Sequence, residues 1–220
     1  MRRYKSIAVI LVLAFLGQPF AFAKPIDPIT FSFASDDFEN GPTFTGLPGN
    51  AIIGKAELKL YIDLNHDLPG GKVVLKSIFR FKGETYKYQV VPYGGQWLHM
   101  WRVRGGYEFR QAGLGGLPIL TSRFNQAVLT SISPSKYYAG ETLTLQDSER
   151  VDPNILMVPH KPLLALGVGP NDLNYSEDFA FTFTSTKPVW SLIPLTSTGA
   201  FVDKWTSEGS YSAAAIRVLP

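Results

Sequence analysis

Two runs of alternating apolar and polar residues constrain the fold of this chain more than any other feature of the sequence. Every second residue is apolar in residues 55–62, and the same period of two continues in residues 72–81. Successive side chains of a strand point to opposite faces of a sheet, so each run has one apolar and one wet face. The segment that joins them is rich in Asp, Asn, Pro and Gly, which favour turns. The two runs predict an antiparallel hairpin with a long polar loop.

Shorter runs of the same kind follow along the rest of the chain, with Gly- and Pro-rich turns between them. The clearest is residues 178–185, where Phe179, Phe181 and Phe183 alternate with smaller residues. No continuous helix can be placed. Regularly spaced short strands predict an all-β protein, a single-domain antiparallel β-sandwich or jelly roll spanning residues 24–220. The other runs expected to form strands are residues 31–34, 85–91, 96–104, 107–111, 124–132, 142–146, 163–168, 189–195 and 211–218.

Residues 1–23 have the composition of an export signal. Arg2, Arg3 and Lys5 precede an apolar stretch at residues 7–16, and a small-x-small motif at residues 21–23 provides a cleavage site. The apolar stretch is shorter than the roughly 20 residues that span a bilayer. We therefore expect the segment to be removed, which leaves a mature chain without a transmembrane anchor. The expected location is secreted or periplasmic, with a Gram-negative host favoured.

The charge balance of the expected mature chain excludes one class of partner. The chain has 21 Lys and Arg against 18 Asp and Glu. The three basic residues of the export signal account for the whole excess, so the mature chain is neutral. Nucleic-acid binding requires a cationic face, and we expect none. The chain has no cysteine, which excludes disulfides and thiolate metal sites.

The loop of the central hairpin holds the one plausible metal site in the sequence. Asp63, Asn65 and Asp67 place oxygen ligands at alternate positions, a spacing that suits a hard cation such as calcium. The pattern resembles the opening of an EF-hand loop but departs from it, because Leu68 replaces the required Gly and Val74 replaces the bidentate Glu. An EF-hand is therefore excluded. A looser calcium site and an ordinary Asx-rich turn both remain open.

An aromatic cluster in residues 86–107 is the best candidate for ligand binding. Its members Tyr93, Trp97, Trp101 and Tyr107 are flat rings with a polar edge, which suit sugar faces and protein contacts alike. Packing in the core is the competing interpretation. Tyr93 precedes one glycine pair and Tyr107 follows another, so both are expected to be exposed. Trp97 and Trp101 are expected inside.

Motifs of known catalytic chemistry are absent from the sequence. There is no nucleophile elbow, cysteine nucleophile, phosphate-binding loop or dinucleotide fingerprint. A glycosidase carboxylate pair stays open, with Glu108 among Arg102, Arg104 and Arg110 as its first candidate and a salt-bridge ladder as the alternative.

The sequence thus predicts an exported, non-enzymatic binding or surface protein of a bacterial envelope. The alternative is a carbohydrate-binding or carbohydrate-active module with calcium at the 63–67 loop. A glycan or another surface protein is the expected partner.

Overall fold

The computed structural model describes the chain in seven stretches, which together hold ten strands, one short α-helix and one 3-10 helix. All strand pairings among these residues are antiparallel. The all-β prediction is therefore confirmed. The described residues are 28–34, 44–64, 71–113, 116–147, 156–173, 177–188 and 199–215.

The described strands differ widely in length, from three residues to 22. In chain order the elements are β1 (Ile29–Phe33), β2 (Phe44–Gly46), β3 (Ala51–Asp63), β4 (Lys72–Tyr93), β5 (Gln96–Gln111), β6 (Pro118–Ser133), β7 (Leu143–Gln146), β8 (Leu156–Pro159), α1 (Lys161–Ala165), η2 (Pro170–Leu173), β9 (Glu177–Lys187) and β10 (Trp205–Ala215).

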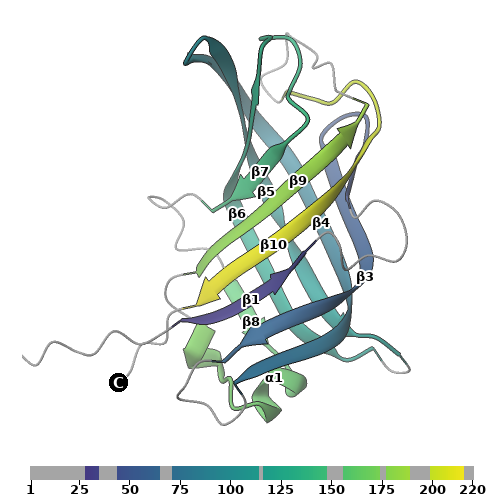
Figure 1. Ribbon diagram of the computed structural model, residues 1–220, viewed down its shortest axis with the longest axis vertical. Coiled ribbons are helices and arrows are strands. Elements are labelled where there is room, and N and C mark those ends of the chain that lie inside the picture. The colour runs from purple at the N-terminus through teal and green to yellow at the C-terminus, as the bar shows by residue number, and fades with distance from the viewer. Residues whose placement is uncertain are drawn as a thin grey trace, which may run out of the picture.

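The strands form one continuous sheet that closes on itself. Strands β3 to β7 are neighbours in chain order, β7 pairs with β9, and β9 pairs with β10. The circle is completed by β1 and β2, each of which pairs with both β10 and β3. Opposite walls of the closed sheet thus pack against each other as the layers of a sandwich would, and they enclose a single core (Figure 1).

Aromatic rings fill the space between these walls. Phe181 of β9 is fully buried, and its ring centroid lies 4.8 Å from that of Tyr211 and 5.2 Å from that of Tyr107. Phe44 and Phe183 approach to 4.5 Å in an edge-to-face arrangement. Such pairs add to the free energy gained from burying the rings. The alternating apolar positions of the sequence are the residues that supply this core.

The central hairpin is formed as the alternation predicts. Strands β3 and β4 pair in register from Ala51 opposite Glu84 to Asp63 opposite Lys72. However, β4 does not end before Gly83, and the pair Gly105–Gly106 lies inside β5 rather than between strands. A Cβ atom on Gly105 would lie 2.1 Å from the Lys82 carbonyl oxygen. These glycines therefore permit close contact between paired strands, a role that glycine also has inside sheets.

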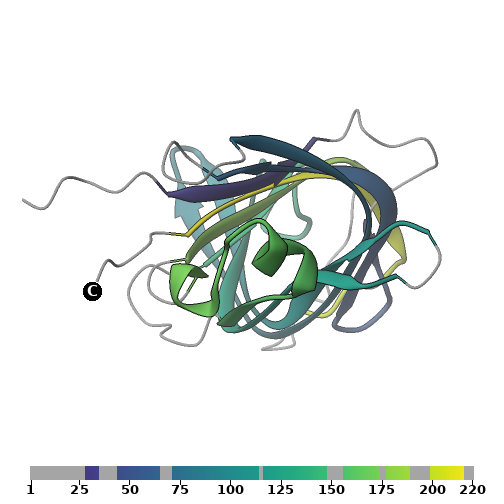
Figure 2. The same ribbon diagram turned by 90° about the horizontal axis from the view of Figure 1, so that it is seen from below.

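The prediction of a strand at residues 163–168 is wrong. These residues form most of α1 and the turn after it, with Pro162 in the first turn of the helix, where the missing N–H costs nothing. Leu163 and Val168 are fully buried, and α1 lies across one end of the closed sheet (Figure 2). A short apolar run cannot be assigned to strand or helix by periodicity alone.

Two predicted segments lie outside the described residues: the export signal and the strand at 189–195. Across the stretches that the structure describes, no helix has the length and apolar character needed to cross a membrane.

Candidate functional site

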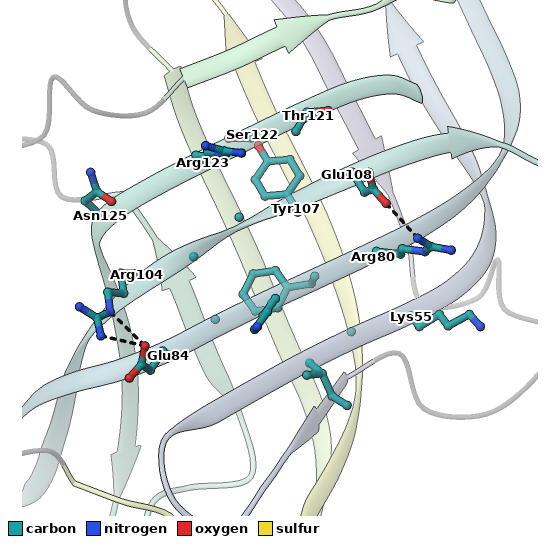
Figure 3. Close-up of a pocket in the computed structure, with 17 residues that line it drawn as sticks. Lys55, Arg80, Glu84, Arg104, Tyr107, Glu108, Thr121, Ser122, Arg123 and Asn125 are labelled. Carbon is teal, nitrogen blue, oxygen red and sulfur yellow. Dashed lines mark hydrogen bonds and ion pairs between the residues drawn. The ribbon is translucent and has the colours of Figure 1, made fainter. Parts of the chain in front are cut away.

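A groove of about 750 Å³ crosses the outer face of strands β3, β4, β5 and β6, and we call it the central groove (Figure 3). Its volume falls within the range of about 300–1,000 Å³ that is typical of ligand sites. Its polar and charged walls are formed by Lys55, Arg80, Lys82, Glu84, Arg104, Glu108, Thr121, Arg123 and Asn125, with Ile53 at one side and Gly54, Gly83, Gly105 and Gly106 in the floor.

The register of the four strands arranges these outward side chains in three rows that run across the sheet. The first row is Lys55, Arg80, Glu108 and Thr121; the middle row is Ile53, Lys82, Gly106 and Arg123; the third contains Glu84 and Arg104. The first and middle rows take one residue from each strand, and the third takes one each from β4 and β5, at positions fixed by the backbone ladder.

The acids of the first and third rows are paired with arginines. Glu108 accepts hydrogen bonds from Arg80 at 3.3 Å and from Arg110 at 3.2 Å. Glu84 accepts two hydrogen bonds from Arg104, at 3.0 and 2.9 Å. The two ion pairs lie at opposite ends of the groove (Figure 3).

The middle row differs because its cations are not neutralised. Lys82 and Arg123 stand on either side of Gly106, and neither has an ion pair or side-chain hydrogen bond to another described residue. The same holds for Lys55 in the first row, which stands opposite Arg80. The centre of the groove is therefore positively charged and open to solvent.

The floor of the groove offers apolar backbone surface rather than free hydrogen-bonding groups. Gly83 and Gly105 lie directly opposite each other, and the backbone groups around them are committed to the ladders between the four strands. Glycine allows close approach of a ligand or of a neighbouring backbone. Any ligand in the groove would thus contact a flat floor and be held by side chains of the walls.

The four predicted aromatic site residues are not brought together. Tyr93 is 57% exposed at the end of β4, and Trp97 is half-buried. Trp101 is fully buried, and its Nε1 donates to the Gly199 carbonyl oxygen at 2.9 Å. Trp97 and Trp101 therefore cannot form an open platform with Tyr93.

Tyr107 is 3% exposed, so the prediction that its ring is exposed is wrong. The preceding glycines continue the strand, and the alternation of β5 then turns Tyr107 inward. Its hydroxyl accepts a hydrogen bond from the Tyr211 hydroxyl at 3.0 Å. The residue lines the central groove, but its ring belongs to the core.

The predicted metal site falls mostly outside the described residues. Asp63 forms an ion pair with Lys72 at 3.6 Å, across the base of the hairpin. Asn65 and Asp67 are not described. No group of three or more His, Cys, Asp or Glu suited to a metal occurs in the described stretches. Calcium at this loop stays a prediction.

A buried polar cluster surrounds His99 on β5. Its Nε2 lies 2.9 Å from the Ser135 carbonyl oxygen, which can only accept, so Nε2 carries the proton. Nδ1 then accepts a hydrogen bond from the Tyr88 hydroxyl at 2.8 Å. Burial lowers the pKa of His99 below its usual value, although the hydrogen bond to Ser135 opposes this. Burial also raises the pKa of Tyr88 to about 12.

This cluster does not form a nucleophile and its base. Ser133 Oγ lies 3.4 Å from His99 Nε2, but that nitrogen is protonated and cannot accept the hydroxyl proton. Ser133 and His99 are also buried. The arrangement is that of a satisfied polar network inside the sheet.

The carboxylates of the groove do not fit glycoside hydrolysis. Glu84 and Glu108 lie on adjacent strands, with four residues of offset along the sheet. Ordinary strand geometry then separates their Cα atoms by roughly 14 Å, and each carboxylate stays in its own row because an arginine of that row holds it. Retaining and inverting glycosidases need carboxyl groups at about 5–5.5 and 6.5–9.5 Å. Of the predicted ladder, Arg104 and Arg110 are paired with Glu84 and Glu108, and Arg102 donates to the Gln126 carbonyl oxygen.

Comparison with known proteins gives no matching family model, no similar curated protein and no similar solved structure. The groove itself therefore carries the functional argument. Sequence reasoning missed Lys82 and Arg123 as site residues. The signal that could have found them is the abundance of Lys and Arg at the wet positions of the alternating runs.

Proposed function

We propose that this chain is an exported, non-enzymatic binding protein of a bacterial envelope, and that it holds an anionic ligand in the central groove. The observation that carries the proposal is the middle row, in which Lys82 and Arg123 flank Gly106 without a carboxylate. Every acid in the groove is already engaged at its two ends. An anion over Gly106 would supply the missing counter-charge.

Binding is favoured over catalysis by the placement of the reactive side chains. The two groove carboxylates are too far apart to act together on one glycosidic bond, and each is held by arginine. The buried histidine donates through the nitrogen that faces Ser133. What the described part of the groove offers a ligand is charge, hydroxyl and amide groups on a flat floor.

The groove also suits a ligand that is larger than a simple ion. Asn125 lies on β6 beside Arg123 and provides a neutral hydrogen-bonding group. The Thr121 hydroxyl lies 2.8 Å from His160 Nε2 and retains capacity for a further hydrogen bond. The guanidinium of Arg104 lies 5.9 Å from the centre of the Tyr86 ring, whose hydroxyl donates to the Asn125 carbonyl oxygen at 3.2 Å. The wall at this end is therefore built from interlocked side chains.

The alternative proposal is a carbohydrate module that binds through aromatic rings, with calcium at the 63–67 loop. It has less support, because Trp101 and Tyr107 are buried and only Tyr93 of the four rings is largely exposed. Asp63 in turn pairs with Lys72.

The groove is tested by removing its two unpaired central cations. We expect Lys82→Gln/Arg123→Gln to weaken binding of tri-galacturonate or tri-glutamate about tenfold or more in calorimetry at low salt, since about 1.4 kcal/mol corresponds to a tenfold change and a hydrogen bond to a charged group contributes about 1.5–3 kcal/mol. Both side chains are exposed, so the fold should tolerate the change.

The matched control is Lys59→Gln/Lys76→Gln, which removes the same charge from an opposed pair on β3 and β4 outside the groove. Its affinity for the short probes should equal that of the wild type. The proposal is overturned if neither probe binds the wild type, or if both double variants weaken binding equally.

A further inference from the structure

The charged residues of this protein are strongly segregated between the walls of the closed sheet. Strands β3 to β6 contain eleven Lys and Arg residues but only four Asp and Glu residues, an excess of seven positive charges. The remaining strands contain one basic and three acidic residues. A chain that is nearly neutral overall thus presents one markedly cationic wall, which we call the cationic face.

Like charges stand directly opposite each other at three places on this face. The opposed pairs are Lys55 with Arg80, Lys59 with Lys76, and Lys87 with Arg102. Directly opposed like charges destabilise a sheet. Three such pairs on one face lower the stability of the sheet, and an anionic partner would relieve the repulsion.

The cationic face is much longer than the central groove. Along β4, basic residues recur at Lys72, Lys76, Arg80, Lys82 and Lys87. At about 3.3 Å per residue, the row from the first to the last extends roughly 50 Å. The groove lies in the second half of this row, at Arg80 and Lys82. A small anion would use only a fraction of the face.

We infer that the cationic face binds a linear acidic polysaccharide, one stretch of which lies in the central groove while the rest follows the row of β4. The inference rests on the proposed function of the groove and specifies its ligand. Carboxylate or sulfate groups along the chain meet the lysines and arginines in turn. Its hydroxyl groups meet Asn125 and the Thr121 hydroxyl, which also contacts His160, and its sugar rings lie on the glycine floor.

Three other polyanions fit the same face less well. An acidic peptide that binds by adding a strand needs a free sheet edge, whereas the groove crosses the face of four paired strands. A peptide held by its charges alone would contact the same basic side chains, and poly-glutamate tests for it. Single-stranded nucleic acid needs several aromatic platforms for its bases, whereas the outward ring at the described groove is that of Tyr86 at one end, and Arg104 lies over it. An anionic membrane is flat, but the wall formed by these strands is curved (Figure 2).

The test compares long and short probes on the folded protein. Polygalacturonate and heparin should bind the wild type about tenfold or more tightly than tri-galacturonate, while neutral dextran should not bind. Lys59→Gln/Lys76→Gln should weaken binding of the two polymers about tenfold and leave the trimer unaffected. Lys161→Gln/Lys204→Gln removes the same charge from exposed positions away from the face, and should change neither. Added salt should weaken polymer binding.

The outcomes separate this inference from the proposed function. If the trimer binds through Lys82 and Arg123 but the polymers gain nothing from Lys59 and Lys76, the groove proposal stands and the polysaccharide inference fails. It also fails if poly-glutamate, duplex DNA or phosphatidylglycerol vesicles bind as tightly as the acidic glycans. If no acidic probe binds at all, both proposals are overturned.

Discussion

Inside the sheet, His99 is an ionisable side chain in an environment that favours its neutral form. It is fully buried, and both ring nitrogens are engaged, one with Tyr88 and one with Ser135. Trp101 covers one side, with ring planes 19° apart. The charged form would lose its hydration here, which is why burial lowers the pKa.

This environment predicts a pH-dependent stability. Because the folded pKa lies below the usual value of about 6.5, the unfolded chain binds a proton first as pH falls. The free energy of unfolding of the wild type should therefore decrease below about pH 6.5, by up to about 1.4 kcal/mol per pH unit, until the folded pKa is reached. Urea unfolding between pH 8 and pH 5 measures this slope.

The matched variant is His99→Gln, which retains polar groups but cannot titrate in this range. Its unfolding free energy should lack the slope attributed to His99, whereas His160→Gln, at a half-buried site, should keep it. Equal slopes in the wild type and His99→Gln would contradict this account.

Single side chains also show where sequence reasoning succeeds. Trp101 was correctly expected inside the protein, and Tyr93, beside its glycine pair, outside it. The same reasoning failed at Tyr107 because the glycines before it were interpreted as a turn, and the face on which a residue lies depends on the strand continuing without interruption.

At the level of elements, the hairpin of β3 and β4 places Lys59 directly opposite Lys76, and this like-charge pair lowers the stability of the fold. Replacing Lys59 with Glu places a carboxylate opposite Lys76. Lys59→Glu should raise the free energy of unfolding by about 0.2–1 kcal/mol, the usual contribution of a favourable cross-strand pair. Chemical unfolding at low salt measures the change, and the gain should shrink as salt is added.

The control for this substitution is Lys204→Glu, which makes the same charge change at an exposed position outside the cationic face. A gain of equal size there would assign the effect to net charge rather than to the opposed pair.

The elements that could be predicted are those with local signals. The alternating runs at residues 55–62, 72–81 and 178–185 predict most of β3, the first half of β4 and most of β9, together with their buried faces. The helix α1 could not be recognised, because five residues carry too little periodicity. The closure of the sheet, in which β1 and β2 each pair with both β10 and β3, depends on contacts between distant segments, which local patterns do not encode.

For the whole molecule, stability depends on the aromatic core that joins the two walls. Phe181→Ala should lower the free energy of unfolding by about 3–5 kcal/mol, because the deleted ring contacts aromatic residues from several strands and leaves a cavity. Denaturant unfolding measures the loss. Tyr93→Ala, at an exposed end, should change it by no more than about 0.5 kcal/mol.

The charge distribution over the whole molecule could not be predicted from composition. Composition gives only the net charge, and a net charge of zero led to the expectation of no cationic face. The closed sheet places the wet faces of β3 to β6 side by side and so brings together basic residues that are distant in the sequence. The candidate site was therefore unpredictable without the strand order.

The backbone ladder on both sides of β4 and β5 has one further consequence. Lys82 and Arg123 are separated by two hydrogen-bonded strand-to-strand steps, and the protein cannot change that interval without breaking the sheet. Only rotation of these two side chains can adapt the groove to a ligand. The protein should therefore distinguish two acidic chains of equal charge density by the distance between their acid groups.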